Sequence, residues 1–426
     1  MLGAITGDII GSRFEFDRGN KSKDFELFTP ECDFTDDTVM TIAVAEALLS
    51  SGKDAGEKTI KENLIKSMKK WGQKYPYAGY GQRFIGWVLS DDPKPYGSFG
   101  NGSGMRVSSV GWLYDTIERT REVARWTAEV THNHPEGIKG AESVAAAIFM
   151  ARNFASKEEI EKYIEDEFGY DLSRTLDDIR PTYEHVEDCM HTMPEAFECF
   201  LESESYEDCV RNVMYIGGDT DTLAAISGAI AEAFWGMPVM LALKAKEYLP
   251  DEMGEVLTKF DKAVNGDEDV DPYVHNKYIK MGVKRFEETH NVEDLILLLE
   301  VLIKRMREDG EAPTPMVDVN NVMGEFDPDK LILGKSIEIG KEMRLRKDTM
   351  KSSDGSEWFP LFTDIEELNK QPTTNINMNC PIRIILEDAL NSDRVEGAVI
   401  NPFGQSFTLN KEILKMLFNH FERSSE

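Results

Sequence analysis

Residues 217–235 read GGDTDTLAAISGAIAEAFW, and this stretch decides how the first part of the chain folds. Small and apolar residues follow Thr222 at spacings that are typical of an α-helix. Alanine and glycine dominate the beginning of the apolar run, Glu232 lies inside it and Pro238 breaks it. The sequence therefore predicts a closely packed buried helix, because a membrane span needs roughly 20 predominantly apolar residues with few or no charges.

Helical spacing of apolar residues recurs through residues 1–265. Convincing alternating strands are few in this region, and several stretches begin with Asp, Thr or Pro-Glu, which favour helix starts. We therefore expect a mainly α fold here, an all-helical bundle. The stretches with the clearest helical spacing are 38–50, 57–71, 137–155 and 222–235.

The chain changes character after residue 265. NGDEDVDP at 265–272 predicts an acidic surface connection, 273–309 a charged helical hairpin divided near 289–291, and GEAPTPMVD at 310–318 a proline-containing linker. Beyond about residue 320, short apolar or alternating stretches and helical runs predict a small α/β domain. The expected strands are at 331–339, 343–349, 358–363 and 395–401, and the helices at 364–370 and 410–421. The predicted parts are 1–265, a helical connector at 266–318, and an accessory domain at 319–426.

Composition limits the classes of function. The formal net charge of −30 argues against nucleic-acid binding, where Lys and Arg must neutralise phosphates. The five cysteines form no CxxC pair, so neither a disulfide framework nor a zinc ribbon is expected. The N-terminal apolar run lacks a preceding basic segment and is interrupted by Asp8, unlike a signal peptide. We therefore expect a cytoplasmic protein that does not bind membranes.

Two aspartate clusters stand directly before predicted helices, FTDDT at 34–38 and GGDTDT at 217–222. Each cluster alone could be a helix cap, because a helix N-terminus favours carboxylates and hydroxyls. A cap needs one acceptor, however, whereas two adjacent carboxylates repel each other unless a cation is near. Such oxygen ligands suit Mg²⁺ or Mn²⁺, and the two clusters together could hold a metal pair. Their spacing does not show whether they meet in space.

A glycine-rich segment, GSFGNGSGMR at 97–106, suggests an anion site. Glycines let backbone amides approach a phosphate, and successive amides form an anion nest without net positive charge. A dinucleotide-binding loop is a competing interpretation, but no strand precedes the segment and the glycine spacing is wrong. A flexible loop is a second alternative. Phe99 could stack on a ribose or base, and Arg106 could hold the loop or contact phosphate.

Taken together, these segments resemble the ADP-ribosylglycohydrolase family over residues 1 to about 250. The resemblance implies an all-helical bundle with two Mg²⁺ ions, or Mn²⁺, that hydrolyses the bond between ADP-ribose and an acceptor. It rests on five blocks in the family's order, GAITGDIIGSRFEF at 3–16, FTDDT at 34–38, GSFGNGSGMR at 97–106, THNHPEG at 131–137 and GGDTDT at 217–222.

Carried over to this chain, the resemblance implies a role for individual residues. A carboxylate from Glu15, Asp36 or Asp37 would assist proton transfer, and Glu15 matches a glutamate that only some members have. His132 matches a family histidine near the ribose. A packing role without substrate contact is the alternative for His132 and also for His134. The implied metal ligands are Thr35, Asp36, Asp37, Asp219, Asp221 and Thr222. The implied substrate-binding residues are Gly97, Ser98, Phe99, Gly100, Asn101, Gly102, Ser103 and His132.

The implied substrate is ADP-ribose on a protein side chain, such as arginine or serine, or on a small molecule. The alternative is a non-catalytic ADP-ribose-binding protein whose tail recruits a partner, against which the intact metal residues argue. Residues 352–370 and 397–414 resemble the N-terminal domain of the enhanced serine sensitivity protein B family. That second resemblance spans about residues 325–422 and implies an interaction or regulatory module more than chemistry, with a protein as the possible partner.

Overall fold

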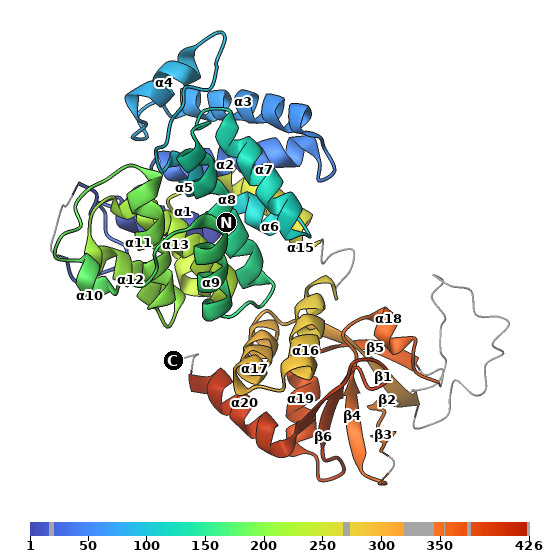
Figure 1. The fold of residues 1–426 in the computed structure, drawn as a ribbon. Coiled ribbons are helices and arrows are strands. Elements are labelled where there is room, and N and C mark those ends of the chain that lie inside the picture. The colour runs from blue at the N-terminus through green and yellow to red at the C-terminus, as the bar shows by residue number, and fades with distance from the viewer. Residues whose placement is uncertain (17–20, 267–272, 319–344, 353, 373–375, 424–426) are drawn as a thin grey trace. The chain divides into compact units, whose positions relative to one another are not determined.

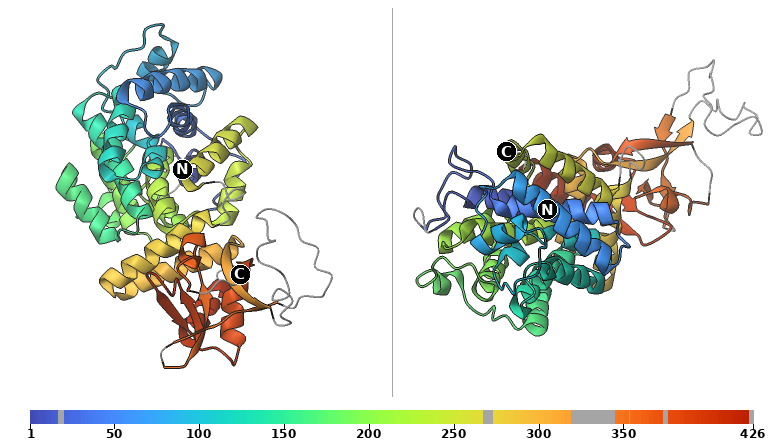
Figure 2. Two further views of the ribbon diagram at one scale, coloured as in Figure 1. Left: turned by 90° about the vertical axis from the view of Figure 1, so that its right-hand side faces the viewer. Right: turned by 90° about the horizontal axis from the view of Figure 1, so that it is seen from above.

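The computed structural model describes residues 1–16, 21–266, 273–318, 345–352, 354–372 and 376–423. The chain divides into two compact units, Met1–Val264 and Asn265–Glu426. Among the described residues, the first unit is built from helices, and the named strands all belong to the second unit (Figures 1 and 2).

The first unit packs its helices around one apolar core. The predicted all-helical fold is confirmed, and the four stretches singled out from the sequence are helices α2, α3, α8 and α13. None of the described helices is long and apolar enough to cross a membrane. The helices are α1 (Leu2–Gly11), α2 (Asp36–Ser51), α3 (Glu57–Lys74), α4 (Gln82–Leu89), α5 (Gly102–Met105), α6 (Ser108–Leu113), α7 (Ile117–Glu129), α8 (Pro135–Arg152), α9 (Lys157–Phe168), α10 (Leu176–Ile179), α11 (Cys189–Leu201), α12 (Tyr206–Ile216), α13 (Thr220–Trp235), α14 (Val239–Lys246) and α15 (Asp251–Asn265).

The closest helix contact in this unit is between α1 and α13. Three glycines spaced four residues apart place one face of α1 directly against the backbone of α13. A Cβ atom at Gly7 would lie 2.0 Å from the carbonyl oxygen of Ala224, and one at Gly11 would lie 2.5 Å from that of Thr220. Side chains larger than hydrogen are therefore excluded, and the contact brings α1 to the N-terminal end of α13. The glycines are Gly3, Gly7 and Gly11.

The second unit contains two small sheets and a separate apolar core. One sheet has the order β2-β1-β5 and is antiparallel, whereas the other has the order β3-β4-β6-β7, with β4 and β6 parallel. The strands are β1 (Glu311–Asp318), β2 (Leu345–Lys347), β3 (Met350–Lys351), β4 (Glu357–Leu361), β5 (Ile376–Pro381), β6 (Gly397–Ile400) and β7 (Phe407–Asn410). The helices are η1 (Val274–Asn276), α16 (Lys277–Thr289), α17 (Val292–Arg307), α18 (Ile365–Leu368), α19 (Ile382–Asn391) and α20 (Lys411–Arg423).

The prediction of a linker at 310–318 is wrong, because residues 311–318 form strand β1. Residues 311–316 pair with β5, and β2 joins the other side only at 316–318. Pro313 thus lies where β1 has a described strand neighbour on one side only, whereas the carbonyl of Pro315 accepts from the amide of Asp348 at 2.9 Å, just beyond the end of β2. A missing N–H is tolerated at such an edge, so these prolines do not prevent a strand.

The predicted helical connector packs within the second unit. Ile279 of α16 and Leu298 of α17 belong to the same apolar core as Leu386 of α19. The division between compact units therefore places the residues predicted as connector together with the α/β region. The predicted strand at 331–339 lies outside the described residues. Besides β1, the elements of the second unit that were not expected from the sequence are β3, β5, β7 and α19.

Candidate metal and substrate site

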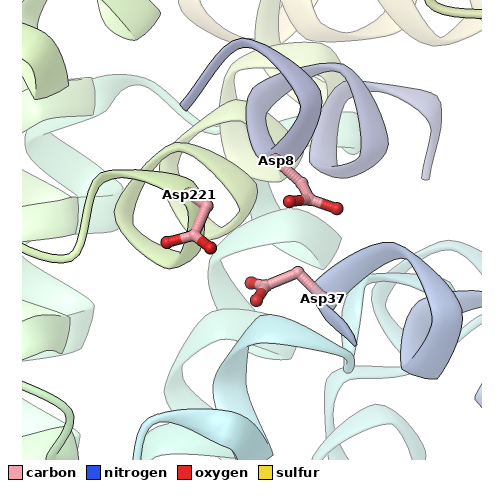
Figure 3. Close-up of side chains that lie close together, drawn as sticks. All are labelled: Asp8, Asp37 and Asp221. Carbon is pink, nitrogen blue, oxygen red and sulfur yellow. The ribbon is translucent and has the colours of Figure 1, made fainter. Parts of the chain in front are cut away.

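Carboxylates from α1, α2 and α13 point toward one another at one end of the α1–α13 contact (Figure 3). Asp8, Asp37 and Asp221 each offer an oxygen atom, and these three oxygens lie within 4.8 Å of one another. A second group of the same compactness contains Glu15, Asp219 and Asp221. The two predicted clusters therefore meet, and Asp221 belongs to both groups. Such an arrangement of hard oxygen ligands could hold metal ions.

Asp8 was not predicted as a site residue, yet it organises the beginning of α2. Its carboxylate accepts hydrogen bonds from the amide and hydroxyl of Thr35, at 3.0 and 2.7 Å, and from the amide and hydroxyl of Thr38. Thr35 in turn caps α2 by accepting from the amide of Asp37 at 3.3 Å. The sequence signal for Asp8 was a single carboxylate in the middle of a helix of small and apolar residues.

The hydroxyl of Thr222 links the two clusters directly. It donates to Oδ2 of Asp37 at 3.2 Å, across the gap between α13 and α2. Asp36 lies at the edge of the site, where a Cβ atom on Gly79 would be 3.1 Å from its Oδ1, and it belongs to neither compact group. Asp37, Asp221 and Thr222 are buried, whereas Asp36 is half-buried.

Burial and mutual repulsion dominate the electrostatics of the site. Burial, followed by the charges of Asp221 and Asp8, raises the pKa of Asp37 well above its usual range, and the same causes act on Asp36. Burial also raises the pKa of Asp219 to about 7, although hydrogen bonds from Asp221 and Asn101 oppose this shift. Carboxylates that repel one another in a buried place favour either protons or a cation.

The chemistry of these residues fits a divalent cation. Oδ1 of Asp37 is buried and accepts no hydrogen bond from the described residues. Within the described part of the chain, no lysine or arginine forms an ion pair with Asp37, Asp219 or Asp221. A buried carboxylate oxygen without a partner is costly, and coordination to a metal ion would remove that cost.

We expect added Mg²⁺ to stabilise the metal-free protein more as the pH rises. Burial raises the folded-state pKa of Asp8 from 3.8 to about 6 and that of Asp219 to about 7. The folded state therefore retains protons that the unfolded state releases, so this contribution to stability is complete below about pH 4 and disappears by about pH 7. Metal ligands must be deprotonated, and Asp219, a proposed ligand, loses its proton toward the upper end of this range, so Mg²⁺ should bind better as the pH rises.

The measurement is the melting temperature of EDTA-treated protein with and without Mg²⁺, at about pH 5 and about pH 7.5. The Mg²⁺-induced increase should be larger at the higher pH. An increase that stays constant or shrinks with pH would contradict this picture of the carboxylates.

The glycine-rich loop lies beside the second carboxylate group. The side-chain amide of Asn101 donates to Oδ2 of Asp219 at 2.6 Å and to the hydroxyl of Thr192 at 3.2 Å. The backbone amide of Asn101 donates to the carbonyl of Glu187 at 2.9 Å, and that of Cys189 donates to the carbonyl of Phe99 at 2.9 Å. The loop is thus tied both to a predicted metal ligand and to the segment before α11.

Several groups of the glycine-rich loop already take part in hydrogen bonds within the protein. The amide of Gly97 donates to Oδ1 of Asn133 at 2.7 Å, and that of Gly100 donates to the hydroxyl of Ser98 at 3.2 Å. The side chain of Ser103 is fully buried, and its hydroxyl donates to the carbonyl of Gly137 at 2.6 Å. These groups hold the loop in shape, so a ligand would meet the remaining amides near Phe99 and Gly102 and not the hydroxyl of Ser103.

Aromatic and histidine side chains border the loop. Phe99 is 44% exposed, and its ring contacts that of His134 edge to face at 5.3 Å. Nδ1 of His134 accepts from the amide of Glu136 at 3.2 Å, so this histidine caps α8. His132 is buried, and a Cβ atom on Gly102 would lie 3.3 Å from its Nε2. Both histidines therefore border the loop: His134 contacts the Phe99 ring, and His132 turns Nε2 toward the backbone at Gly102.

Comparison with known proteins shows which proteins this chain resembles. The model of the ADP-ribosylglycohydrolase family matches residues 1–266. Human ADP-ribosylhydrolase ARH3 is 26% identical over 314 residues, covering 56% of this chain and 84% of that protein. ADP-ribosylarginine hydrolase Tri1 of Pseudomonas putida is 25% identical over 276 residues, covering 56% of this chain and 70% of that protein. A chain from a solved ADP-ribosylglycohydrolase-related protein complex is 23% identical with a TM-score of 0.47, covering 62% of this chain and 97% of its own length.

Proposed function

Because this chain belongs to the ADP-ribosylglycohydrolase family, we propose that it uses Mg²⁺ to hydrolyse the glycosidic bond between ADP-ribose and an acceptor. Family membership makes the chain a glycosidic-bond hydrolase. The observation that carries the rest is the pair of carboxylate groups that share Asp221 beside the glycine-rich loop. Carboxylate oxygens of this kind suit a divalent metal ion, and the neighbouring glycine-rich backbone supports the proposal of a diphosphate site.

Residues at the N-terminal ends of α2 and α13 would hold two metal ions. A bound metal pair would orient the ribose hydroxyls and lower the pKa of a water molecule. Mn²⁺ prefers similar oxygen ligands and is the alternative ion. Asp8 would act by fixing Thr35 and the first turn of α2, since both its oxygens already accept hydrogen bonds. The proposed ligands are Thr35, Asp36, Asp37, Asp219, Asp221 and Thr222.

Glu15 and Asp36 are the proposed proton-transfer residues. Glu15 follows α1 and is half-buried, so its carboxylate can face both the ion-binding group and solvent. Asp36 lies at the edge of the site, and burial together with the charges of Asp221 and Asp8 raises its pKa well above the usual range, which favours proton transfer by its carboxyl group. Asp37 is more deeply buried, and its Thr222 hydrogen bond directs it toward a ligand role.

The acceptor side of the substrate is proposed as an ADP-ribosylated protein side chain. The candidate acceptor side chains are arginine and serine. One related protein, Tri1 of Pseudomonas putida, is named as an ADP-ribosylarginine hydrolase. For the ADP-ribose side, we propose that the partly exposed Phe99 ring contacts a ribose or a base. A small-molecule conjugate of ADP-ribose is the further candidate. The proposed location is the cytoplasm, and the second unit is proposed to bind a protein partner.

The test measures release of ADP-ribose by the full chain from peptides modified on arginine or on serine, with Mg²⁺, with Mn²⁺ or with EDTA. We expect release from one linkage in preference to the other, and loss of release in EDTA that added metal restores. Release that is insensitive to EDTA would overturn the metal assignment. ADP-ribose binding without turnover on either peptide, or on a small-molecule conjugate, would favour the non-catalytic alternative.

A further inference from the structure

A buried hydrogen-bond chain leads from Arg106 through Thr131 to His132. The guanidinium of Arg106 donates to the hydroxyl oxygen of Thr131 at 2.7 Å and to the carbonyl of Thr127 at 3.3 Å. The same hydroxyl lies 2.7 Å from Nδ1 of His132. All three side chains of the chain are buried, so water does not compete for these bonds.

The donor and acceptor properties of these groups favour one arrangement of the protons. A guanidinium has donors only, so the Thr131 oxygen must accept from it. The Thr131 hydroxyl has one proton, and Nδ1 of His132 is its only hydrogen-bond acceptor among the described residues. If that proton goes to Nδ1, then Nδ1 carries none, and the ring proton of neutral His132 lies on Nε2.

Nε2 of His132 faces the glycine-rich loop. A Cβ atom would lie 3.3 Å from this nitrogen if placed on Gly102 and 3.5 Å from it if placed on Gly100. Within the described part of the chain, Nε2 has no hydrogen-bond acceptor. An N–H group that is oriented by protein on one side and lacks an acceptor on the other is available to a ligand oxygen.

We propose that Arg106 and Thr131 are positioning residues that hold His132 as the neutral Nε2–H tautomer, so that it donates to an oxygen atom of the substrate at the glycine-rich loop. This inference rests on the proposed function for the identity of the substrate, a ribose hydroxyl or phosphate oxygen of ADP-ribose. It assigns Arg106 to the support of the loop and removes it from direct contact with phosphate.

The surroundings of His132 favour its neutral form. Burial, followed by the positive charges of Arg106 and Arg83, lowers its pKa well below the usual range. The ring of Tyr96, at 6.1 Å, is the aromatic neighbour. A neutral donor also avoids a further buried cation beside Arg106, which would cost desolvation energy and add repulsion between like charges.

The first test is ¹⁵N NMR of the full chain labelled on histidine. The chain has seven histidines, and the signals of His132 are assigned by their loss in His132→Gln. We expect an unprotonated Nδ1 and a protonated Nε2 at neutral pH. A proton on Nδ1 would overturn the proposal. The spectrum is recorded without substrate, so the tautomer of His132 is determined independently of any hydrolysis assay. If peptides are not hydrolysed, the proposed function fails while the tautomer result stands.

The second test compares substitutions of buried threonines. In Thr131→Val the ring loses its fixed donor, so we expect a populated Nδ1–H tautomer and about 3–10-fold weaker ADP-ribose binding, the scale of one hydrogen bond. Thr131→Ser keeps the hydroxyl and should restore both properties. Thr120→Val is the matched control, because Thr120 is buried in α7 and donates only to the carbonyl of Thr116. Equal tautomer populations and affinities in Thr131→Val and the parent chain would overturn the proposal.

Discussion

Asp221→Asn is expected to reduce turnover by about a thousandfold or more, the scale on which removal of one electrostatic group acts at an active centre. Asp221 belongs to both compact carboxylate groups, so this single change weakens both proposed ion sites at once. The shape of the side chain is retained, and its Oδ1 atom can still accept from the Thr222 amide, a bond of 3.0 Å in the parent chain. The loss should therefore arise from charge and not from unfolding.

The measurements are steady-state release of ADP-ribose and Mg²⁺ binding by calorimetry. Binding should weaken along with turnover, while the melting temperature of the metal-free variant should hold or rise, because a mutually repelling buried charge is removed. Asp54→Asn is the control, since Asp54 is an exposed acid just beyond the end of α2. Parent-like Mg²⁺ affinity in Asp221→Asn would contradict the assignment of this residue to the ion sites.

Gly7→Ala is expected to lower the free energy of unfolding by about 3 kcal/mol or more, at the upper end of overpacking effects. The added Cβ would lie 2.0 Å from the carbonyl oxygen of Ala224. That oxygen belongs to the backbone of α13, so no side-chain rotation relieves the contact. The helices would have to separate, and Asp8 on α1 would move away from Asp221 on α13.

Gly86→Ala provides the matched control for this prediction. Gly86 lies within α4, and a Cβ atom there would have no neighbour within 4 Å, so alanine should stabilise the helix by about 0.5–1 kcal/mol. Urea unfolding followed by tryptophan fluorescence reports mainly on the first unit, since Trp358 is the one tryptophan of the second. A Gly7→Ala protein within about 0.5 kcal/mol of the parent would refute the close backbone contact, since that is the usual range of surface substitutions.

Part of the candidate site, the two aspartate clusters, could be predicted from the sequence. Residues at the start of α2 and α13 could be identified because capping and metal-ligand chemistry depend on a few consecutive residues. The role of Asp8 could not be identified from the sequence, because a single carboxylate in an apolar helix has no local pattern that reveals its partners. Its partners Thr35 and Thr38 are more than twenty positions away in the chain.

The second unit shows the same limit in its backbone. Helices α17 and α20 have apolar spacing that the sequence reveals, whereas β1 was hidden by Pro313 and Pro315. Whether prolines end a strand depends on which neighbour is present on each side, and that is decided by pairing with β5.

By itself, the sequence determined the helical first unit, the two aspartate clusters and the glycine-rich loop, since periodicity and end signals act over a few residues. Only the tertiary structure decided that the clusters meet, that Asn101 holds Asp219 and that Arg106 supports His132 through Thr131. The physical reason is the packing of α1 on α13. Gly7 allows two backbones to touch, and this contact sets which helix ends, and therefore which carboxylates, share one site.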